Sequence, residues 1–398
     1  MATENKKYIP ALRFPEFQND GEWKCVIIGD IISTINPPKK LQSSEYKKKG
    51  AFPIVDQSAS YIAGYSDNGD AVIDNNGYNY IVFGDHTCSL KLIDFPFIQG
   101  ADGIKIFKSK ITEVLTEYLY QYIFAHPINS KEYKRHFSDL KEKLLLYPTK
   151  ACEQKKIADC LSSLDNYIDA TKRKLELLKE HKKGLMQRLL PAKGKTIPEL
   201  RFPEFSHREN WNIVSLGEVT EVVNKRNKSN RTLPVYSINN VDGFIPQSQQ
   251  FDGMDSEARG YDISAYKIIG KHTFAYNPAR INVGSIGYSG DLKDILISSL
   301  YVCFKTTDIV DDTFLMCFFN SHIFNQAVEC NVEGGIRSYL FYENFSRIKL
   351  AIPKLDEQKR IASCIMSIDC EIKKINDKID LLETHKKGLQ QQLFPRFK

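Results

Sequence analysis

Two stretches of the chain, 153–189 and 357–393, place apolar residues at alternating spacings of three and four. This spacing predicts two long amphipathic helices, each with one apolar stripe and a polar remainder, as in a coiled coil. The first stripe is formed by Ile157, Leu161, Leu164, Ile168, Thr171, Leu175, Leu178, Lys182, Leu185 and Leu189. At the same positions the second stripe has Ile361, Ile365, Ile368, Ile372, Ile375, Ile379, Leu382, Lys386, Leu389 and Leu393.

A helix with one apolar stripe needs a partner, because it is marginal alone in water. A single heptad run would suit a helical hairpin or a homodimerising coiled coil. Since both stretches belong to one chain and have equal length, we expect them to pair with each other. Each spans roughly 55 Å at ~1.5 Å per residue, whereas a compact domain of about 160 residues has a radius of gyration of only ~15 Å. The intervening segment must then begin and end near one end of the pair, which predicts antiparallel helices.

Two lysines, Lys182 and Lys386, interrupt the stripes. We expect their stems to lie along apolar surface near opposite ends of the pair, with the ammonium groups reaching water close to a helix C-terminus. Both helices are predicted to stop at proline, Pro191 and Pro395, because proline cannot continue a helix.

The remainder of the chain is also repeated. Segment 12–17 (Leu-Arg-Phe-Pro-Glu-Phe) returns as 200–205, and Trp23 returns as Trp211 at the same spacing. We interpret these proline-aromatic segments as arms that pack on a neighbouring element. Fainter echoes relate 52–58 to 233–239, 81–87 to 267–273 and 117–126 to 314–322, and a last strand ends at Pro148 or Pro353.

The predicted fold class is therefore α+β, with two globular α+β domains separated by a long intramolecular antiparallel two-helix coiled coil and related by an approximate two-fold axis. The expected boundaries are 1–150 for the first domain, 151–194 for the first spacer helix, 195–355 for the second domain and 356–398 for the second spacer helix. A body with two similar but divergent domains at a fixed separation suits the reading of duplex DNA.

Composition narrows the class. The 398 residues are 42% hydrophobic and 26% charged, which is ordinary for a soluble globular protein. The chain has no run of about 18 apolar residues, and no apolar core follows the charges of the amino terminus, which argues against membrane insertion and secretion. Nine cysteines without a C-x-x-C pair argue for a reducing cytoplasm and against structural zinc. The net charge of +6 leans basic but does not by itself indicate nucleic-acid binding.

Catalytic motifs are mostly missing. Asn36-Pro37-Pro38-Lys39 is the only candidate for an amino-methyltransferase motif, and it lacks the aromatic residue that would stack on a flipped base, so we interpret it as a loop. No phosphate-binding loop of the G-x-x-x-x-G-K-[ST] type occurs. The Asp/Glu-x-Lys triplets of a Mg²⁺ nuclease are interpreted as solvated charge; they begin at Asp139, Asp291 and Glu371. His86-Thr87 and His272-Thr273 recur at places that we take as equivalent, as turn residues or DNA contacts. We therefore predict no catalytic residue and no metal ligand.

Polar loop residues offer groups suited to DNA instead. Arginine pairs with guanine, asparagine with adenine, and serine or tyrosine with phosphate. The candidate DNA-binding residues of the first domain are Gln57, Ser58, Tyr61, Tyr65, His86, Thr87 and Lys91. Those of the second are Asn239, Asn240, Lys271, His272, Asn277, Arg280, Asn282, Ser285, Tyr288 and Arg337.

The whole chain resembles the DNA specificity subunit of a type I restriction-modification system. The resemblance rests on the two arms, on the Gln-Lys-[Lys/Arg]-Ile-Ala segments 154–158 and 358–362 that open the long helices, and on stretch 277–287. It implies two target recognition domains on an antiparallel helical spacer, which together read a bipartite DNA sequence with an unspecified gap. It also implies two modification subunits that use S-adenosylmethionine, and restriction or motor subunits that need ATP and Mg²⁺, with no cofactor in this chain.

Three hypotheses follow. The first is a non-catalytic reader of double-stranded DNA, which predicts two short selected motifs with a fixed gap. The second is a self-sufficient methyltransferase, which the missing cofactor loop disfavours. The third is a structural coiled-coil adaptor, which would show no sequence preference.

Overall fold

The structure is a computed structural model that describes residues 8–101, 103–128, 135–240, 243–250, 253–332 and 339–395. The chain divides into two compact units. Unit 1 comprises Met1–Arg173 and Asn376–Lys398, and unit 2 comprises Lys174–Ile375. Each unit therefore combines one globular domain with part of both long helices, and the four-segment division of the chain stays a prediction.

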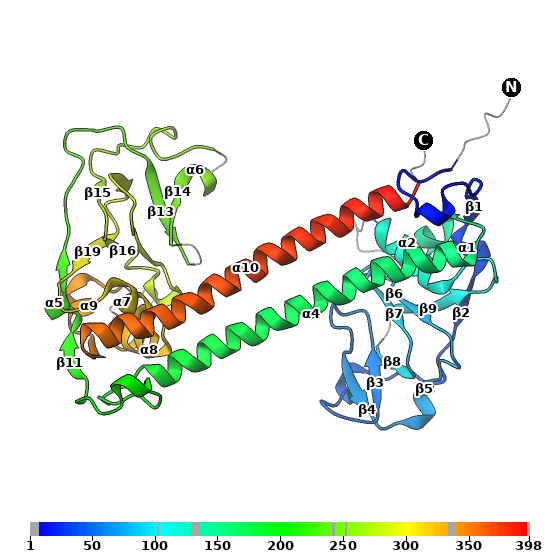
Figure 1. Ribbon diagram of the computed structural model, residues 1–398, viewed down its shortest axis with the longest axis horizontal. Helices are drawn as coiled ribbons and strands as arrows, with labels where there is room; N and C mark the ends of the chain where they lie inside the picture. The colour runs from blue at the N-terminus through cyan, green and yellow to red at the C-terminus, as the bar shows by residue number, and fades with distance from the viewer. Residues whose placement is uncertain are drawn as a thin grey trace. The chain divides into compact units, whose positions relative to one another are not determined.

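The globular part of unit 1 is built from short strands and a few helices (Figure 1). Its strands are β1 (Lys24–Ile27), β2 (Ile32–Ile35), β3 (Phe52–Val55), β4 (Gly64–Ser66), β5 (Val72–Ile73), β6 (Tyr80–Gly84), β7 (Leu90–Ile93), β8 (Phe97–Gln99), β9 (Ile104–Ser109) and β10 (Leu144–Tyr147). Its helices are α1 (Ile28–Ile31), α2 (Thr116–Ala125) and α3 (Phe137–Glu142), with 3-10 turns at Pro15–Phe17, Ser43–Glu45 and Gly69–Ala71.

Unit 2 repeats the strands of unit 1 but differs in its short helices. Its strands are β11 (Asn212–Ser215), β12 (Thr220–Val222), β13 (Val235–Asn239), β14 (Gly243–Pro246), β15 (Lys267–Ile269), β16 (Phe274–Tyr276), β17 (Ile286–Tyr288), β18 (Ile295–Ile297), β19 (Val302–Thr306) and β20 (Lys349–Ile352). Its helices are α5 (Leu216–Val219), α6 (Gln247–Gln250), α7 (Asp312–Phe319), α8 (His322–Asn331) and α9 (Tyr342–Ser346), with 3-10 turns at Pro203–Phe205 and Ile281–Val283.

The two units have the same sheet topology. Unit 1 contains the strand orders β2-β9-β6-β7, β4-β3-β8-β5 and β1-β10, and unit 2 contains β12-β19-β16-β17, β14-β13-β18-β15 and β11-β20. The central pairs β3–β8 and β13–β18 are parallel in both units. Each strand of unit 1 therefore has one counterpart in unit 2, which confirms the predicted duplication.

This topology corrects one of the sequence echoes. Segment 81–87 contains β6, whose counterpart is β16, whereas segment 267–273 contains β15, the counterpart of β5. The alignment of these segments was wrong because short buried strands that end at glycine look alike in sequence, and only strand pairing separates them. The echoes between β3 and β13, and between α2 and α7, are confirmed.

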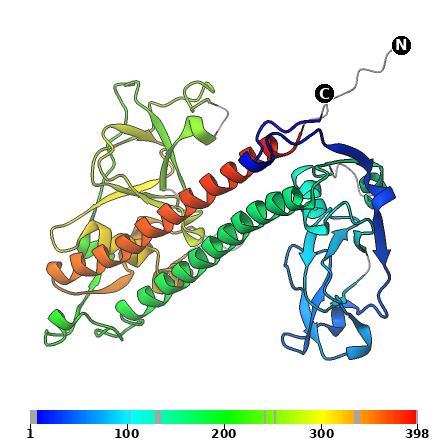
Figure 2. The same cartoon turned by 45° about the vertical axis from the view of Figure 1, so that its right-hand side comes forward.

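Both long helices form as predicted. They are α4 (Ala151–Leu189) and α10 (Leu355–Leu393), and they lie side by side in both views of the chain (Figures 1 and 2). Every predicted stripe position of both helices is buried or half-buried. In unit 1, Ile157 and Leu161 share a core with Leu389 and Leu393. In unit 2, the far end of α4 packs with the first turns of α10, where Ile361 and Ile365 lie. The helices are therefore antiparallel.

Ion pairs across the helices involve the two stripe lysines. Lys386 pairs with Asp165 in unit 1, and its side chain is only 7% exposed. Lys182 lies 2.5 Å from Asp369 in unit 2, with its side chain 22% exposed. The prediction that the ammonium groups reach water is wrong for Lys386, because an acidic partner on the facing helix allows the amine to be buried. Polar pairs inside an apolar seam favour one register over its neighbours.

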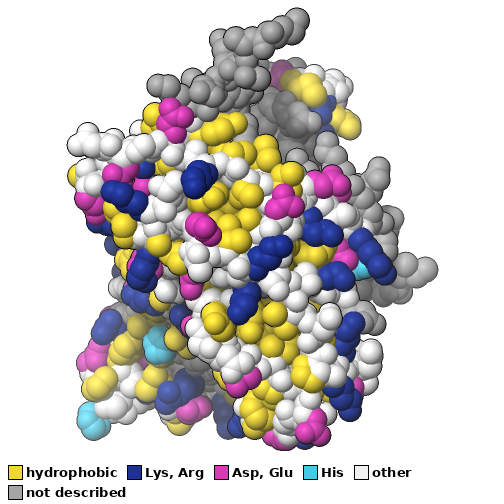
Figure 3. All heavy atoms as spheres, turned by 90° about the vertical axis from the view of Figure 1, so that its right-hand side faces the viewer, with side chains coloured by type: hydrophobic (Ala, Val, Ile, Leu, Met, Phe, Trp, Pro, Cys, Tyr) yellow, Lys and Arg dark blue, Asp and Glu magenta, His cyan; other side chains and the backbone are white. Residues whose placement is uncertain are grey.

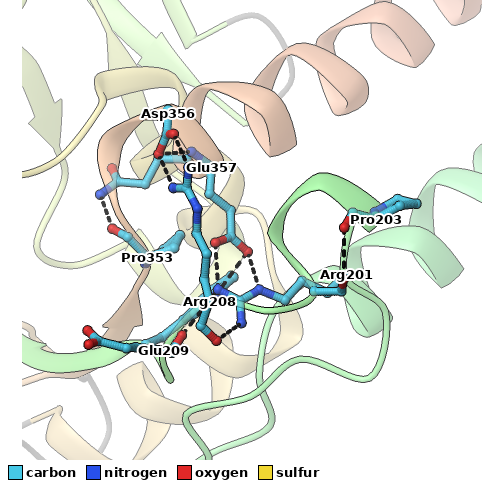
Figure 4. Close-up of polar contacts among 10 residues, drawn as sticks. Arg201, Pro203, Arg208, Glu209, Pro353, Asp356 and Glu357 are labelled. Atoms are coloured by element: carbon cyan, nitrogen blue, oxygen red, sulfur yellow. Dashed lines mark hydrogen bonds and ion pairs between the residues drawn. The ribbon is translucent and has the colours of Figure 1, made fainter.

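The proline-aromatic arms clamp the first turn of each long helix. Arg201 donates to both carboxylate oxygens of Glu357 at 2.9 and 2.8 Å (Figure 4). Arg13 donates in the same way to both carboxylate oxygens of Glu153 at 2.7 Å. Both glutamates are 1% exposed. The guanidinium of Arg201 also donates to the carbonyls of residues 208 and 209, at 3.0 and 3.2 Å. The interpretation of the arms as packing elements is confirmed.

A buried glutamine follows each glutamate and fixes the domain to the helix. The amide of Gln154 accepts from Leu115 N at 2.9 Å and donates to the carbonyls of residues 113 and 148. Gln358 accepts from Asp311 N at 2.8 Å and donates to the carbonyls of residues 309 and 353. Because both side chains are fully buried, the start of each long helix is held to its domain by matched hydrogen bonds.

Each domain is layered. The largest core of a unit lies between the first four-stranded sheet and the helices, and it contains Trp23 and Tyr118 in unit 1 and Trp211 and Phe314 in unit 2. A second core lies between the two four-stranded sheets. The face drawn in Figure 3 shows hydrophobic side chains gathered in two places, with Lys and Arg side chains between them. In the described part of the chain, no helix combines the length and apolar character needed to cross a bilayer.

Candidate nucleic-acid interface

Three connections of unit 1 meet at one end of its sheets. They leave the carboxyl ends of β3, β6 and β8, and we call their residues 56–63, 85–89, 100, 101 and 103 loop surface 1. Thr87 Oγ1 donates to the carbonyl of Gln57 at 3.1 Å, and Asp85 N donates to the carbonyl of Gly103 at 2.6 Å. A β-carbon on Gly103, whose φ is +92°, would lie 3.0 Å from Nε2 of Gln57. Gln57 and Thr87 are therefore neighbours, although they are distant in sequence.

Lys91 supports this surface from below. Its amine donates to the carbonyl of Asp56 at 2.7 Å and to that of Ser60 at 2.5 Å, and the residue is 5% exposed. Burial lowers the pKa of Lys91, with the nearby charge of Asp56 acting in the opposite direction. An amine bonded to two carbonyls beneath a loop positions that loop, and a DNA contact of Lys91 stays a prediction.

The other candidates of unit 1 lie on or next to loop surface 1. Ser58 is exposed, and its N–H donates to Oδ1 of Asp56 at 2.9 Å. Tyr61 is 49% exposed, and its hydroxyl donates to the carbonyl of Leu92. Burial raises the pKa of Tyr61 to about 12, so it stays a neutral phenol. His86 is half-buried in the connection after β6, while Tyr65 lies within β4 and pairs through its backbone with Lys47.

The counterparts of these connections form loop surface 2 in unit 2, which comprises residues 240, 277–285 and 298–301. The long turn after β16 is closed by its own backbone and by Asn277, whose Oδ1 accepts from Ala279 N at 3.0 Å. Asn277 N also donates to the carbonyl of Ser285 at 3.0 Å, and Ser285 is 2% exposed. Arg280 and Asn282 are exposed. The turn thus uses Asn277 and Ser285 to hold its shape and presents Arg280 and Asn282 to solvent.

Tyr301 belongs to loop surface 2 but was not among the candidate residues predicted from the sequence. Its hydroxyl accepts from Ile238 N at 3.5 Å, near the end of β13 where Asn239 and Asn240 follow. Burial raises the pKa of Tyr301, and the charge of Arg280 lowers it. The bond from Ile238 N brings Tyr301 next to the end of β13, which sequence spacing alone could not show.

Lys271, His272 and Tyr288 form a separate group at the other end of the β16–β17 hairpin. His272 Nδ1 lies 2.7 Å from the Tyr288 hydroxyl, which donates to Oδ2 of Asp312 at 2.6 Å. Burial and that hydrogen bond raise the pKa of Tyr288. Lys271 lies 2.5 Å from Asp291. Since His272 precedes its strand whereas His86 follows β6, the two His-Thr pairs are not equivalent, and that prediction was wrong.

Arg337 lies outside the described residues. Within the described ranges, no group of three or more histidine, cysteine or acidic side chains is placed to hold a metal ion.

Comparison with known proteins identifies the family. The family model described as "Type I restriction modification DNA specificity domain" matches residues 20–180 and again residues 208–384. Because the two matches together cover most of the chain, the chain belongs to the type I restriction-modification DNA specificity family. The duplicated match agrees with the duplicated topology.

Individual relatives have low sequence identity to this chain, but the matches cover most of it. The chain is 24% identical to the type I restriction enzyme MjaVIII specificity subunit of Methanocaldococcus jannaschii, over 98% of this chain and 95% of the relative. It is 25% identical to the putative MjaX specificity subunit of the same organism, over 69% of this chain and 60% of the relative. The crystal structure of a type I restriction-modification S subunit from M. genitalium has a TM-score of 0.65 at 15% identity, covering 98% of this chain and 100% of that chain, which shows a shared fold.

Proposed function

We propose that this chain is the DNA-reading subunit of a type I restriction-modification complex and binds a bipartite target. Each unit reads one half-site through its own loop surface, and the bases between the half-sites are not specified. The chain itself carries out no methyl transfer or cleavage.

The observation that carries this proposal is that the two units have the same arrangement of strands but different loops. The strand orders are identical in the two units, while two of the three connections of the loop surfaces differ in length and all three differ in residues. A reader of two different half-sites needs this arrangement, because direct readout depends on side chains placed opposite base edges by a rigid support.

The exposed side chains suit base edges. Arg280 can donate a bidentate pair to guanine, and Asn282 can bind adenine in the major groove. On loop surface 1 the exposed Ser58 offers a hydroxyl, and the half-buried Gln57 beside it offers an amide. Buried groups such as Lys91 and Ser285 support the loops, which lowers the ordering cost of binding DNA.

We propose further that the paired helices act as a spacer that sets the gap. Inserting one heptad into both helices lengthens them by ~10.5 Å, or about 3 base pairs at ~3.4 Å each. A methylation map of the complete system should then show the same two half-sites with a longer gap. An unchanged gap would refute the spacer role.

The partners are two modification subunits, which bind S-adenosylmethionine, together with restriction or motor subunits that use ATP and Mg²⁺. Support comes from Leu177 and Leu381, which occupy matching places on α4 and α10 and are 66% and 69% exposed. Repeated exposed leucines outside the stripe offer the same apolar contact twice. All nine cysteines are free thiols, which agrees with action in a reducing cytoplasm.

Binding-site selection from a random duplex library tests the proposal. The full chain, assembled with its modification subunits, should enrich two short motifs at one fixed separation. Enrichment of a single continuous motif, or none, would contradict it. In parallel, the isolated chain mixed with labelled S-adenosylmethionine and DNA should transfer no methyl group, and transfer would favour the enzyme hypothesis.

A further inference from the structure

Two basic connections occupy the same place in the two units. Residues 36–51 join β2 to β3, and residues 223–234 join β12 to β13. Together they contain nine basic residues and one acidic residue, Glu45. The excess of basic over acidic residues in these two connections is larger than the net charge of +6 of the whole chain. The basic residues are Lys39, Lys40, Lys47, Lys48, Lys49, Lys225, Arg226, Lys228 and Arg231, and all are exposed.

The charge recurs without sequence similarity. The first connection begins Asn-Pro-Pro-Lys-Lys and contains a 3-10 turn, whereas the second reads Val-Asn-Lys-Arg-Asn-Lys. The frame of the protein keeps its residues between units, as the arms and helices show. Here only the positive charge is kept, which indicates a requirement for charge and not for packing.

In unit 1 the basic connection runs beside loop surface 1. Leu41 N donates to the carbonyl of Gln99 at 3.1 Å, and Ala101 N donates to the carbonyl of Leu41 at 2.7 Å. Lys39 and Lys40 come directly before Leu41, so they flank the connection that follows β8. Lys47 pairs through its backbone with Tyr65 at the start of β4, at the same end of the sheet.

In unit 2 the basic connection runs beside loop surface 2. Val223 N donates to the carbonyl of Cys303 at 2.8 Å, and Ile268 N donates to the carbonyl of Lys225 at 2.7 Å. The neighbouring Lys267 donates through Nζ to the carbonyl of Tyr301 at 2.7 Å. Lys225 and Arg226 therefore flank the connection that follows β18, as Lys39 and Lys40 flank the one after β8.

Within the described residues, the ion pairs that are seen involve only part of this charge. Lys47 pairs with Asp67, and Arg231 pairs with Asp294, both at 2.9 Å and both exposed. Lys39, Lys225 and Arg226 take part in none of the ion pairs found across the described residues. Uncompensated cations beside a DNA-reading surface attract phosphate, and such contacts release counterions without reading sequence.

We propose that the connections 36–51 and 223–234 are phosphate-binding elements, with Lys39 and Lys40 of unit 1 and Lys225 and Arg226 of unit 2 contacting the DNA backbone beside each half-site. The proposal rests on the proposed DNA-reading function. In each unit the loop surface then selects bases, and the basic connection supplies affinity that does not depend on the DNA sequence.

The test compares two double variants, Lys39→Gln with Lys40→Gln and Lys225→Gln with Arg226→Gln, in the full chain assembled with its modification subunits. Binding to a duplex carrying the selected target and to a scrambled duplex is measured by fluorescence anisotropy between about 50 and 200 mM salt. Each double variant should weaken both duplexes equally, on the order of tenfold, and reduce the slope of log K against log[salt] by about 2 in magnitude. The selected motif should stay the same.

Matched controls are Lys24→Gln in β1 and Lys349→Gln in β20, which are exposed lysines of the separate two-stranded sheets. They should leave affinity and salt slope unchanged. Charge-preserving Lys39→Arg with Lys40→Arg should bind like the parent chain, and thermal unfolding should be equal for all variants.

An unchanged salt slope in the double variants would overturn the proposal, as would an altered base preference, which would make these residues base readers. Failure of the DNA-reading function is a different outcome, because the parent chain would then select no motif at all.

Discussion

Units 1 and 2 share the same arrangement of strands, but the connections that are long in one unit are short in the other. The connection after β3 spans residues 56–63 in unit 1, whereas β13 and β14 are separated only by residues 240–242 in unit 2. The next connection shows the reverse, with residues 85–89 in unit 1 and 277–285 in unit 2. Each unit thus has one long connection and one short one at the same end of its sheets. The frame tolerates such exchange because loops at strand ends carry little of the core.

The units also support these connections differently. Lys91 pairs across its sheet with Val82, and Gly287 pairs with Ala275 at the matching register position. Lys91 reaches up to bind two carbonyls of the long loop. At Gly287 a β-carbon would lie 3.3 Å from Cα of Gly243, so the first residue of β14 packs directly on β17. The long loop of unit 1 is thus supported by a side-chain amine, while at the matching position of unit 2 two glycines let the strands approach closely.

At the junction between each domain and its long helix, a buried ion pair is the same in both units, whereas an ion pair nearer the surface is not. The buried pair of arm arginine and helix glutamate is the same in both units, but the exposed pair beside it is reversed in sign. Asp20 pairs with Lys150 in unit 1, and Arg208 pairs with Asp356 in unit 2, both at 2.7 Å. Exposed pairs are weak and replaceable, whereas a buried charge requires its partner.

The largest expected effect follows from this contrast. Glu357→Ala leaves Arg201 and the indole N–H of Trp211 without their carboxylate, and should destabilise unit 2 by about 3–5 kcal/mol. Arg208→Ala, which removes the exposed pair with Asp356 and the stacking of the guanidinium on Phe205, should cost much less. Urea unfolding followed by Trp211 fluorescence in a Trp23→Phe background measures unit 2 alone. Equal losses in the two variants would contradict the distinction.

A smaller effect is expected at the loop support. Lys91→Met removes the amine bonded to the carbonyls of Asp56 and Ser60 and should weaken selection of one half-site by about 1–3 kcal/mol. The fold and the other half-site should be unaffected. Binding-site selection checks this, and a uniform loss across all sequences would show that Lys91 contacts phosphate instead.

The smallest effect concerns pH. His126 stacks on Tyr122 with ring centroids 4.3 Å apart, contacts Phe394, and has Lys143 bonded to its carbonyl. Burial lowers the pKa of His126 below its ordinary value of 6.5. The folded state therefore binds fewer protons than the unfolded state, and stability that is present above the unfolded pKa is lost as pH falls below it.

Acidification from about pH 7.5 to 5.5 should thus lower the melting temperature of unit 1, and His126→Phe should reduce that fall. His322 stands at the matching place in unit 2 and is exposed, so His322→Phe is the control and should change nothing. A fall that is equal in the parent chain and His126→Phe would exclude His126 as the cause.

The long helices were predictable because their apolar residues recur with a helical period. The arms were predictable because the same residues occur twice in the sequence. A stripe such as Ile157 to Leu189 fixes a helix and its buried face, and the matching arms fix the duplication. The bonds between Arg13 and Glu153 were not visible in the sequence, because the two residues are distant in the chain.

The loop surfaces were only partly predictable, because the pairing of short strands is not encoded by a period. The segment containing Lys271 and His272 was aligned with the wrong strand for this reason. Lys91 looked like a surface cation, since sequence does not show that a loop crosses above it. Tyr301 was missed because its partner Ile238 is distant in the chain and the two residues meet only after the sheets form.

The central claim is tested most directly by methylation-site mapping of the complete system with the parent chain and with Arg280→Ala. We predict two short motifs at a fixed gap for the parent chain and, for the variant, relaxed choice of base in one half-site by about 1–3 kcal/mol with the other half-site unchanged. Relaxation of both half-sites, or a single continuous motif, would contradict the reading of one half-site by each unit.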